Sequence, residues 1–130
     1  MVIDTSALMA VLIQEPAADQ LVSALEADRT RLISAATVVE SSLVLLGRYG
    51  EPGEPLLDRL LRVIGAEVVP VGDEQVVLAR DAALRFGRGR HPAALNFGDC
   101  FSYALSVARG EPLLFVGNDF SQTDVEVRRW

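Results

Sequence analysis

Hydrophobic and polar residues alternate in two patterns along the chain. Short apolar runs, typical of buried strands, occupy residues 2–4, 31–33, 66–71 and 112–116, and residues 125–128 form a weaker fifth run. Apolar residues recur every three or four positions in the intervening segments, as in amphipathic helices. These predicted helices span residues 6–13, 16–27, 35–48, 52–64, 73–86 and 96–109, and a loop spans residues 87–95. Ser34 is placed to cap the third helix.

Strands that alternate with helices predict an α/β fold with a mostly parallel sheet covered on both faces. The 130 residues are enough for one domain with its own core, so we expect a single domain over residues 1–130. The one cysteine, Cys100, excludes an internal disulfide and suits a reducing cytoplasm. The apolar stretch at residues 7–13 is too short to span a bilayer, so a cytoplasmic protein with no membrane contact is expected.

The formal net charge of −6 argues against a general nucleic-acid coat protein, which would be basic. It does not argue against a nuclease, because a site that gathers carboxylates for metal ions makes its protein acidic. All the basic side chains are arginines. The lack of lysine excludes P-loop chemistry and Schiff bases.

Four acids stand out by position. Asp4 and Asp119 follow predicted strands, whereas Glu40 lies inside a helix and Asp99 in the first turn of another. Since the carboxyl ends of parallel strands share one edge, the fold is expected to bring the four together. Carboxylates that share a pocket must be protonated or bind cations. Hard oxygen ligands suit Mg²⁺ or Mn²⁺, so metal-dependent phosphodiester hydrolysis is the predicted chemistry.

Each acid also has a purely structural interpretation. Asp4 can cap the helix that follows it, and Glu40 can pair with an arginine at a helix edge. Asp99 is favoured by the dipole of its own helix, and Asp119 fits a turn. The set of four is more informative than any one member.

The segment Arg85-Phe86-Gly87-Arg88-Gly89-Arg90-His91 is the only dense basic run. Arg88 and Arg90 can hold RNA phosphates beside the acidic pocket, or the segment can be a solvated loop. His91 is expected to be a loop residue, and Cys100 and Tyr103 are expected to pack. The apolar helices around residues 43–46 and 56–61 can form ordinary core, or a surface for a dimer or an antitoxin.

The chain resembles the PIN-domain ribonucleases, specifically the VapC toxins of type II toxin–antitoxin systems. The matching residues are Val2-Ile3-Asp4-Thr5-Ser6-Ala7, Glu40, and Asn96-Phe97-Gly98-Asp99-Cys100-Phe101-Ser102-Tyr103-Ala104-Leu105, followed by Pro112–Phe115 and Asn118-Asp119-Phe120. The resemblance covers nearly the whole chain in order. It implies a PIN-like (Rossmann-like) three-layer α/β/α sandwich.

The resemblance also implies Mg²⁺-dependent cleavage of RNA, with Mn²⁺ as a second candidate metal and tRNA as a candidate substrate. Neutralisation by a VapB-type antitoxin and a homodimer are implied as well. By position, Asp4, Glu40 and Asp99 match the family's acidic triad, with Asp4 and Asp99 as the main metal ligands. Thr5 or Ser6 would hydrogen-bond to the site. Many relatives carry an acid where this chain has Gly117, and Asp119 is expected to take over that fourth role.

Three other functions compete. A PIN nuclease without toxin activity, acting in RNA processing or on DNA, is the main alternative. A phosphoacceptor receiver domain fits poorly, because receivers carry adjacent acids after the first strand and a lysine near the last. A catalytically dead binding module on the same fold is disfavoured by the presence of Asp4, Glu40 and Asp99.

Overall fold

The computed structural model describes all residues, Met1–Trp130. A parallel sheet of four short strands runs through its centre, in the order β3-β2-β1-β4. The strands are β1 (Val2–Ile3), β2 (Leu32–Ser34), β3 (Glu67–Val69) and β4 (Leu113–Leu114). Because all four strands are parallel, their carboxyl ends meet at one edge of the sheet.

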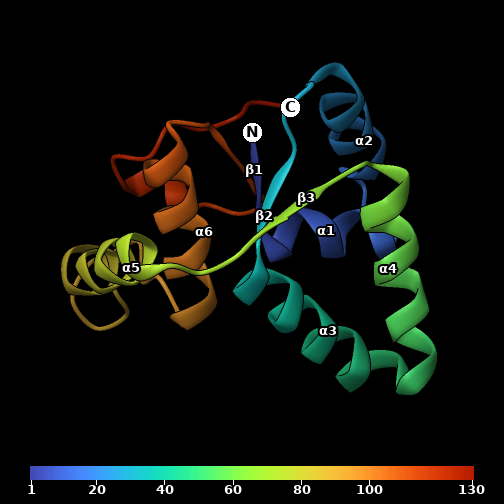
Figure 1. Cartoon of the computed structure of the whole chain (residues 1–130), viewed down its shortest axis with the longest axis horizontal. Coiled ribbons are helices and arrows are strands. Elements are labelled where there is room, and N and C mark those ends of the chain that lie inside the picture. The colour runs from blue at the N-terminus through green and yellow to red at the C-terminus, as the bar shows by residue number, and fades with distance from the viewer.

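Six α-helices cover the sheet on both sides (Figure 1). On one side lie α5 (Asp73–Phe86) and α6 (Phe97–Arg109). On the other lie α1 (Thr5–Leu12), α2 (Ala18–Ala27), α3 (Ala35–Tyr49) and α4 (Glu54–Val63). Two short 3-10 helices, η1 (Glu51–Gly53) and η2 (Phe120–Gln122), complete the regular structure. The predicted α/β fold with a mostly parallel sheet is confirmed, and the layers are those of an α/β/α sandwich.

The two layers of core follow from the alternation of side chains along each strand. In β1, Val2 packs into the core under α5 and α6, whereas Ile3 packs into the core under α1 to α4. Leu113 and Leu114 divide in the same way in β4. Successive residues of a strand point to opposite faces, so each of these two-residue strands ties both cores to the sheet.

Several helix boundaries follow local signals in the sequence. Ser34 caps α3 as predicted, since its side chain accepts a hydrogen bond from the Ala36 N–H at 3.3 Å. Gly110 ends α6 in the left-handed conformation, with φ of 60°. The predicted helix over residues 73–86 is confirmed at both ends. No helix is long and apolar enough to cross a membrane.

Three boundary predictions are wrong. Residues 125–128 form no regular strand and pair with β4 only at one parallel bridge, between Val127 and Leu113. The second helix begins at Ala18 and not at residue 16, after a turn in which Gln14 adopts a positive φ of 56°. The helix predicted over 52–64 is divided into η1 and α4. At that junction Gly53 lies against Leu45 of α3, where a Cβ would be only 3.0 Å from the Leu45 Cβ.

Candidate active site

Asp4 lies directly after β1 and is almost fully buried, with 3% of its surface exposed. It caps α1, since its Oδ2 accepts hydrogen bonds from the Ser6 N–H at 2.9 Å and the Ser6 hydroxyl at 2.6 Å. Its Oδ1 accepts a third from the Ser102 hydroxyl of α6 at 2.7 Å. The capping interpretation is therefore correct, but capping does not account for Ser102, which approaches from the opposite layer of helices.

Ser6 connects this carboxylate to the neighbouring strand. While its hydroxyl donates to Asp4, its Oγ accepts a hydrogen bond from the Val116 N–H at 3.0 Å. Val116 follows β4, so the first and last parts of the chain are joined through one serine at the carboxyl edge of the sheet.

Glu40 projects from α3 beside the same edge. The Thr5 hydroxyl donates to its Oε2 at 2.6 Å, and no arginine pairs with it, so the arginine-pair interpretation is wrong. The carboxylate lies against the backbone of Gly98, where a Cβ would be 2.0 Å from Oε1. Only glycine at position 98 therefore lets Glu40 approach α6 this closely. Burial, and to a lesser extent the charge of Asp4, raise the pKa of Glu40, although the Thr5 hydrogen bond opposes the shift.

Asp99 occupies the first turn of α6 in a capping box with Asn96. The Asp99 Oδ2 accepts from the Asn96 N–H at 2.8 Å, and the Asn96 Oδ1 accepts from the Asp99 N–H at 3.0 Å. Burial, and to a lesser extent the charges of Asp4, Glu40 and Asp119, raise the pKa of Asp99 to about 6, although the hydrogen bond from the Asn96 N–H opposes the shift. The four predicted acids thus act on one another electrostatically.

Asp119 lies at the margin of this cluster. It is exposed and precedes η2, and no hydrogen bond joins it to the other three acids. Its charge nevertheless contributes to the raised pKa of Asp99. Gly117 adopts a positive φ of 118°, a conformation that favours glycine over an acidic side chain. Asp119 as the fourth acidic residue stays a prediction.

The donor set fits a hard divalent cation. Asp4, Glu40 and Asp99 offer only carboxylate oxygens, and none takes part in an ion pair with an arginine or the N-terminal amine. No three acidic, histidine or cysteine side chains converge closely enough to form a complete ion site by themselves. Mg²⁺ is commonly held by one or two carboxylates, with water and phosphate oxygens supplying the rest. One or two carboxylates of this set would therefore suffice for such an ion, with water and phosphate completing its ligands.

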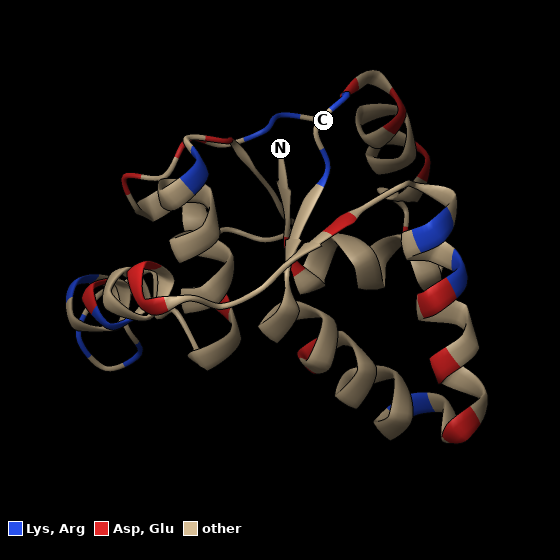
Figure 2. Ribbon diagram, in the orientation of Figure 1, with Lys and Arg blue, Asp and Glu red and all other residues tan.

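The basic loop borders the site but its arginines differ in their roles. Arg85 pairs with Asp81 and Asp124 and lies 4.5 Å from the centre of the Phe86 ring, so it serves the packing of α5. Arg88 and Arg90 are exposed and make no ion pair. Arg88 lines a hollow of about 410 Å³ together with Asn96 and Phe97. Figure 2 shows this basic segment at the end of α5, beside α6.

Other candidate residues serve the structure. The His91 ring packs edge-on against Phe86 at 5.2 Å, and its Nδ1 accepts from the Ala93 N–H. Cys100 is buried in the core, and the buried Tyr103 donates its hydroxyl proton to Asp124 at 2.6 Å. The structural interpretations of these three residues are the correct ones.

Sequence reasoning missed Ser102, whose buried hydroxyl contacts Asp4, and Thr37, whose buried hydroxyl contacts Ser102. One signal was available: Ser102 lies three positions after Asp99 and Thr37 three before Glu40, so each shares a helix face with a predicted acid. Phe97 was also missed as a surface residue, although 81% of it is exposed and it lines a hollow with Glu40.

Known proteins share this fold. The family model of the PIN domain matches residues 1–126, and the chain belongs to the PIN-domain family. Ribonuclease VapC30 of Mycobacterium tuberculosis is 50% identical over 125 residues, covering 96% of this chain and 95% of that protein. Within the PIN family, the chain is thus a relative of the VapC ribonucleases, as its sequence motifs indicated.

Two solved structures share the fold. The sarcin–ricin loop cleaving toxin VapC20 of Mycobacterium tuberculosis aligns with a TM-score of 0.78 at 18% identity, covering 98% of both chains. VapBC2 from Rickettsia felis, bound to a DNA fragment from its promoter, aligns with a TM-score of 0.76 at 13% identity, covering 99% of this chain and 97% of that one. The prediction that the chain is a ribonuclease of the VapC type, from a toxin–antitoxin family, is therefore confirmed at the level of the family. Such ribonucleases are generally dependent on divalent metals.

The raised pKa of Asp99 predicts a pH-dependent penalty on the metal-free fold. Between the pKa of an unfolded aspartate, about 3.9, and about 6, the folded protein retains a proton that the unfolded chain has lost. The contribution of Asp99 to the free energy of unfolding therefore falls as pH rises through this window, and stays low above it. In Asp99→Asn the amide oxygen can still accept the hydrogen bond from Asn96, but the buried charge and its repulsion from the other acids are gone.

With a chelator present, Asp99→Asn should melt higher than the wild type at pH 7.5, by about 4 °C for each 1 kcal/mol of the charge penalty removed. The difference should shrink as the pH is lowered toward 4. Thermal melts across this range provide the test, with Asp58→Asn on the exposed face of α4 as the matched control. A variant no more stable than the wild type at pH 7.5 would contradict the electrostatic account.

Proposed function

We propose that this protein is the toxin of a type II toxin–antitoxin system, a Mg²⁺-dependent endoribonuclease with tRNA as a candidate substrate. The observation that carries the proposal is the group of carboxylates at the carboxyl edge of the sheet. Burial, together with the charges of Asp4, Glu40 and Asp119, raises the pKa of Asp99 there, and no arginine or amine pairs with Asp4, Glu40 or Asp99. The family match over residues 1–126 supports the proposal that the whole chain acts as one domain.

Each acid has a distinct place in the proposed reaction. Asp4 and Asp99 would hold the metal ion, which when bound lowers the pKa of a water molecule and neutralises charge on the phosphate. Glu40 is held by Thr5 through Oε2, and its raised pKa makes it a better proton acceptor for the attacking water. Asp119, exposed at the margin, would complete the acidic edge.

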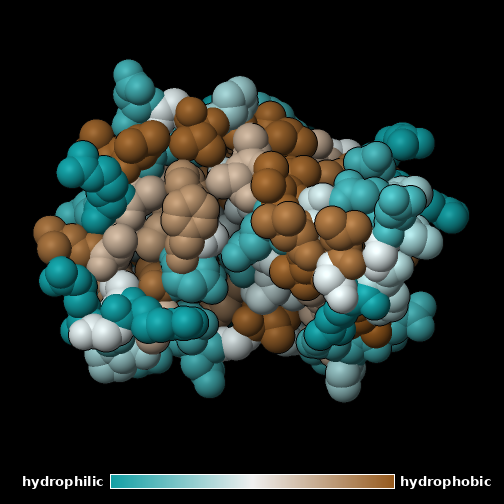
Figure 3. Space-filling model, turned by 90° about the horizontal axis from the view of Figure 1, so that it is seen from below, coloured by the Kyte–Doolittle hydropathy of each residue, from teal (hydrophilic) through white to brown (hydrophobic).

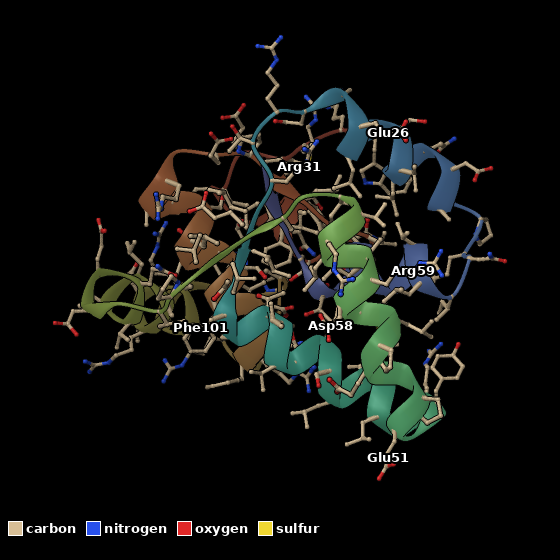
Figure 4. All side chains as sticks on the ribbon, turned by 45° about the vertical axis from the view of Figure 1, so that its right-hand side comes forward. Glu26, Arg31, Glu51, Asp58, Arg59 and Phe101 are labelled. Atoms are coloured by element: carbon tan, nitrogen blue, oxygen red, sulfur yellow. The ribbon has the colours of Figure 1, made fainter.

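Asp4→Asn and Asp99→Asn should each reduce metal-dependent RNA cleavage by more than about 100-fold, because loss of an outer-shell partner alone costs about 10–100-fold. Both should stay folded, since an amide preserves the shape of the side chain. Cleavage of RNA is followed by gel electrophoresis with Mg²⁺, with Mn²⁺ and with a chelator. The matched control is Asp58→Asn, which should cleave like the wild type. Asp58 lies on α4 and is labelled in Figure 4. Normal cleavage by either site variant would refute the assignment.

The toxin role has its own readout. Induced expression of the wild type should arrest bacterial growth, and Asp99→Asn should not. If the purified protein cleaves RNA but its expression leaves growth unaffected, the chain is a PIN nuclease without toxin activity.

Arg88 and Arg90 are proposed to bind RNA phosphates at the border of the site. They are exposed and unpaired, and Arg88 shares its hollow with Asn96, which caps the helix of Asp99. Arginine suits this role because its planar fork matches phosphate oxygens.

The double variant Arg88→Ala, Arg90→Ala should bind RNA more weakly and with a smaller dependence on salt. Each phosphate contact to a single strand contributes about 0.7 to the slope of log K against log salt, so loss of two should reduce the slope by about 1.4. The control is Arg59→Ala, Arg62→Ala on the exposed side of α4, which removes the same charge elsewhere. Equal slopes in the two double variants would mean that the loop is a solvated connector without a role in RNA binding.

A homodimer is proposed to form on the outer face of α3. Much of this helix is uncharged in Figure 2, and Figure 3 shows hydrophobic residues gathered across this side of the molecule between hydrophilic margins. Val39 is 59% exposed, Leu43 64% and Phe97 81%, and all three line one hollow beside Glu40. The prediction of ordinary core around residues 43–46 therefore holds only for the buried Leu45.

Leu43→Asp should convert the dimer to a monomer, because each copy would place an unpaired carboxylate in an apolar interface. Light scattering after size exclusion measures the mass. Val63→Asp, on α4 and 76% exposed in the wild type, adds the same charge away from α3 and should leave the dimer intact. A wild type that is monomeric at tens of micromolar, or a dimeric Leu43→Asp, would contradict this interface.

The antitoxin is proposed to use a different apolar surface. Structural relatives include a VapBC toxin–antitoxin pair, which supports a VapB-type partner. Between α2 and α4 lies a hollow of about 180 Å³ with apolar walls and the charged residues Glu26 and Arg31, both labelled near the upper end of α4 in Figure 4. Its apolar lining residues are Val22, Leu25, Leu60, Val63 and Ile64. An apolar segment of an antitoxin fits such a surface.

A further inference from the structure

Two buried hydroxyl groups form a chain that ends on the carboxylate of Asp4. Thr37 in α3 and Ser102 in α6 are both 0% exposed. Their side-chain oxygens lie 3.2 Å apart, and the Ser102 Oγ lies 2.7 Å from the Asp4 Oδ1. These hydrogen-bonded hydroxyl groups therefore connect one layer of helices to the other, at the carboxyl end of β1.

The direction of each hydrogen bond in this chain follows from the chemistry of its members. A carboxylate can only accept, so Ser102 must donate its single hydroxyl proton to Asp4. Ser102 then has no proton left for Thr37, and Thr37 must donate to the Ser102 Oγ. The order of donation is Thr37 to Ser102 to Asp4, and Thr37 thereby fixes the rotamer of Ser102.

The same hydrogen bonds decide which oxygen of Asp4 stays available. The Oδ2 accepts from both the backbone N–H and the hydroxyl of Ser6, which uses its two lone pairs. The Oδ1 accepts only from Ser102, which leaves one lone pair. Asp4 can therefore bind a cation through Oδ1 alone, in a direction set by Ser102.

The hydroxyl chain also lies one helical turn from the other two acids. Thr37 precedes Glu40 by three residues on α3, and Ser102 follows Asp99 by three residues on α6. Residues three apart share a helix face, so the contact between Thr37 and Ser102 fixes the two helices next to the turns that carry these acids.

We propose that Ser102, oriented by Thr37, is a positioning residue that directs the Oδ1 of Asp4 toward the catalytic cation and fixes the spacing of the carboxylates across α3 and α6. This inference rests on the proposed metal-dependent ribonuclease function. Outer-shell partners of this kind typically change metal affinity or activity by about 10–100-fold when they are removed.

The same helix offers a matched control. Ser106 lies one turn further along α6, is also buried, and donates its hydroxyl proton to the backbone oxygen of Glu111 at 2.6 Å. Ser102→Ala and Ser106→Ala each delete one buried hydroxyl from α6. They differ in that only Ser102 contacts an acid of the site.

Ser102→Ala should weaken binding of Mn²⁺ to the RNA-free protein by about 10-fold or more, as measured by calorimetry and by the electron paramagnetic resonance signal of free Mn²⁺. With saturating Mn²⁺, kcat for RNA cleavage should fall while KM for RNA stays within about twofold, because Ser102 lies beneath the carboxylates and away from the RNA surface. Ser106→Ala should retain the wild-type metal affinity and kcat. Melting temperatures of metal-free proteins measure the structural cost of each substitution.

Thr37→Val provides a second, gentler test that leaves Ser102 and Asp4 in place and remains informative if Ser102→Ala does not fold. It should weaken Mn²⁺ binding by a smaller factor. Because Thr37 acts through Ser102, the double variant should bind Mn²⁺ no more weakly than Ser102→Ala alone, whereas independent roles would multiply the two effects.

Two outcomes would overturn the inference. In the first, Ser102→Ala binds Mn²⁺ as tightly as Ser106→Ala does. If Ser102→Ala does not fold, the same result for Thr37→Val has the same meaning. The other is a double variant in which the two effects multiply. Failure of the proposed function looks different, because then the wild type itself would bind no Mn²⁺ or would cleave no RNA.

Discussion

Mutual repulsion among carboxylates at one edge of the sheet is the constraint on which the rest of the structure depends. Two such groups about 4 Å apart repel by roughly 4 kcal/mol at an effective dielectric constant near 20. In this protein no arginine relieves the repulsion, which adds to burial, the larger cause, in raising the pKa values of Glu40 and Asp99. A fold that keeps these groups together without a counter-charge stores the electrostatic potential that a divalent cation relieves.

The surrounding structure stabilises that arrangement with hydrogen bonds to neutral groups. Ser6 and Ser102 donate to Asp4, Thr5 donates to Glu40, and the Asn96 N–H donates to Asp99. Neutral donors hold carboxylates in place without cancelling their charge, which an arginine would do. Gly98 contributes because it has no side chain, since any side chain at this position would displace Glu40. The charge of the candidate site and the hydrogen bonds that hold its carboxylates are therefore supplied by different residues.

Much of the fold could be predicted because local signals agreed with one another. The apolar strands, the Ser34 cap and the Gly110 stop each have a cause within a few residues. The errors fall where the cause is distant. Residues 125–128 have the composition of a strand but pair with β4 at only one position. The apolar stripe of α3 resembled core in the sequence, yet 64% of Leu43 is exposed, whereas Leu45 is buried in the core that also contains Leu57 of α4.

By itself, the sequence determined the parallel α/β fold and the family, and it predicted the candidate acids, since strand ends and helix first turns are local properties that parallel topology brings to one edge. Only the tertiary structure decided how those acids are held. Ser102 lies 98 residues from Asp4 in the sequence, and Thr37 lies 65 residues from Ser102. No periodicity of the sequence therefore relates these three hydrogen-bonded residues. The tertiary structure also placed Asp119 at the margin and showed Val39 and Phe97 to be surface residues. Burial and contact across helix layers depend on which faces meet, and a one-dimensional pattern does not contain that information.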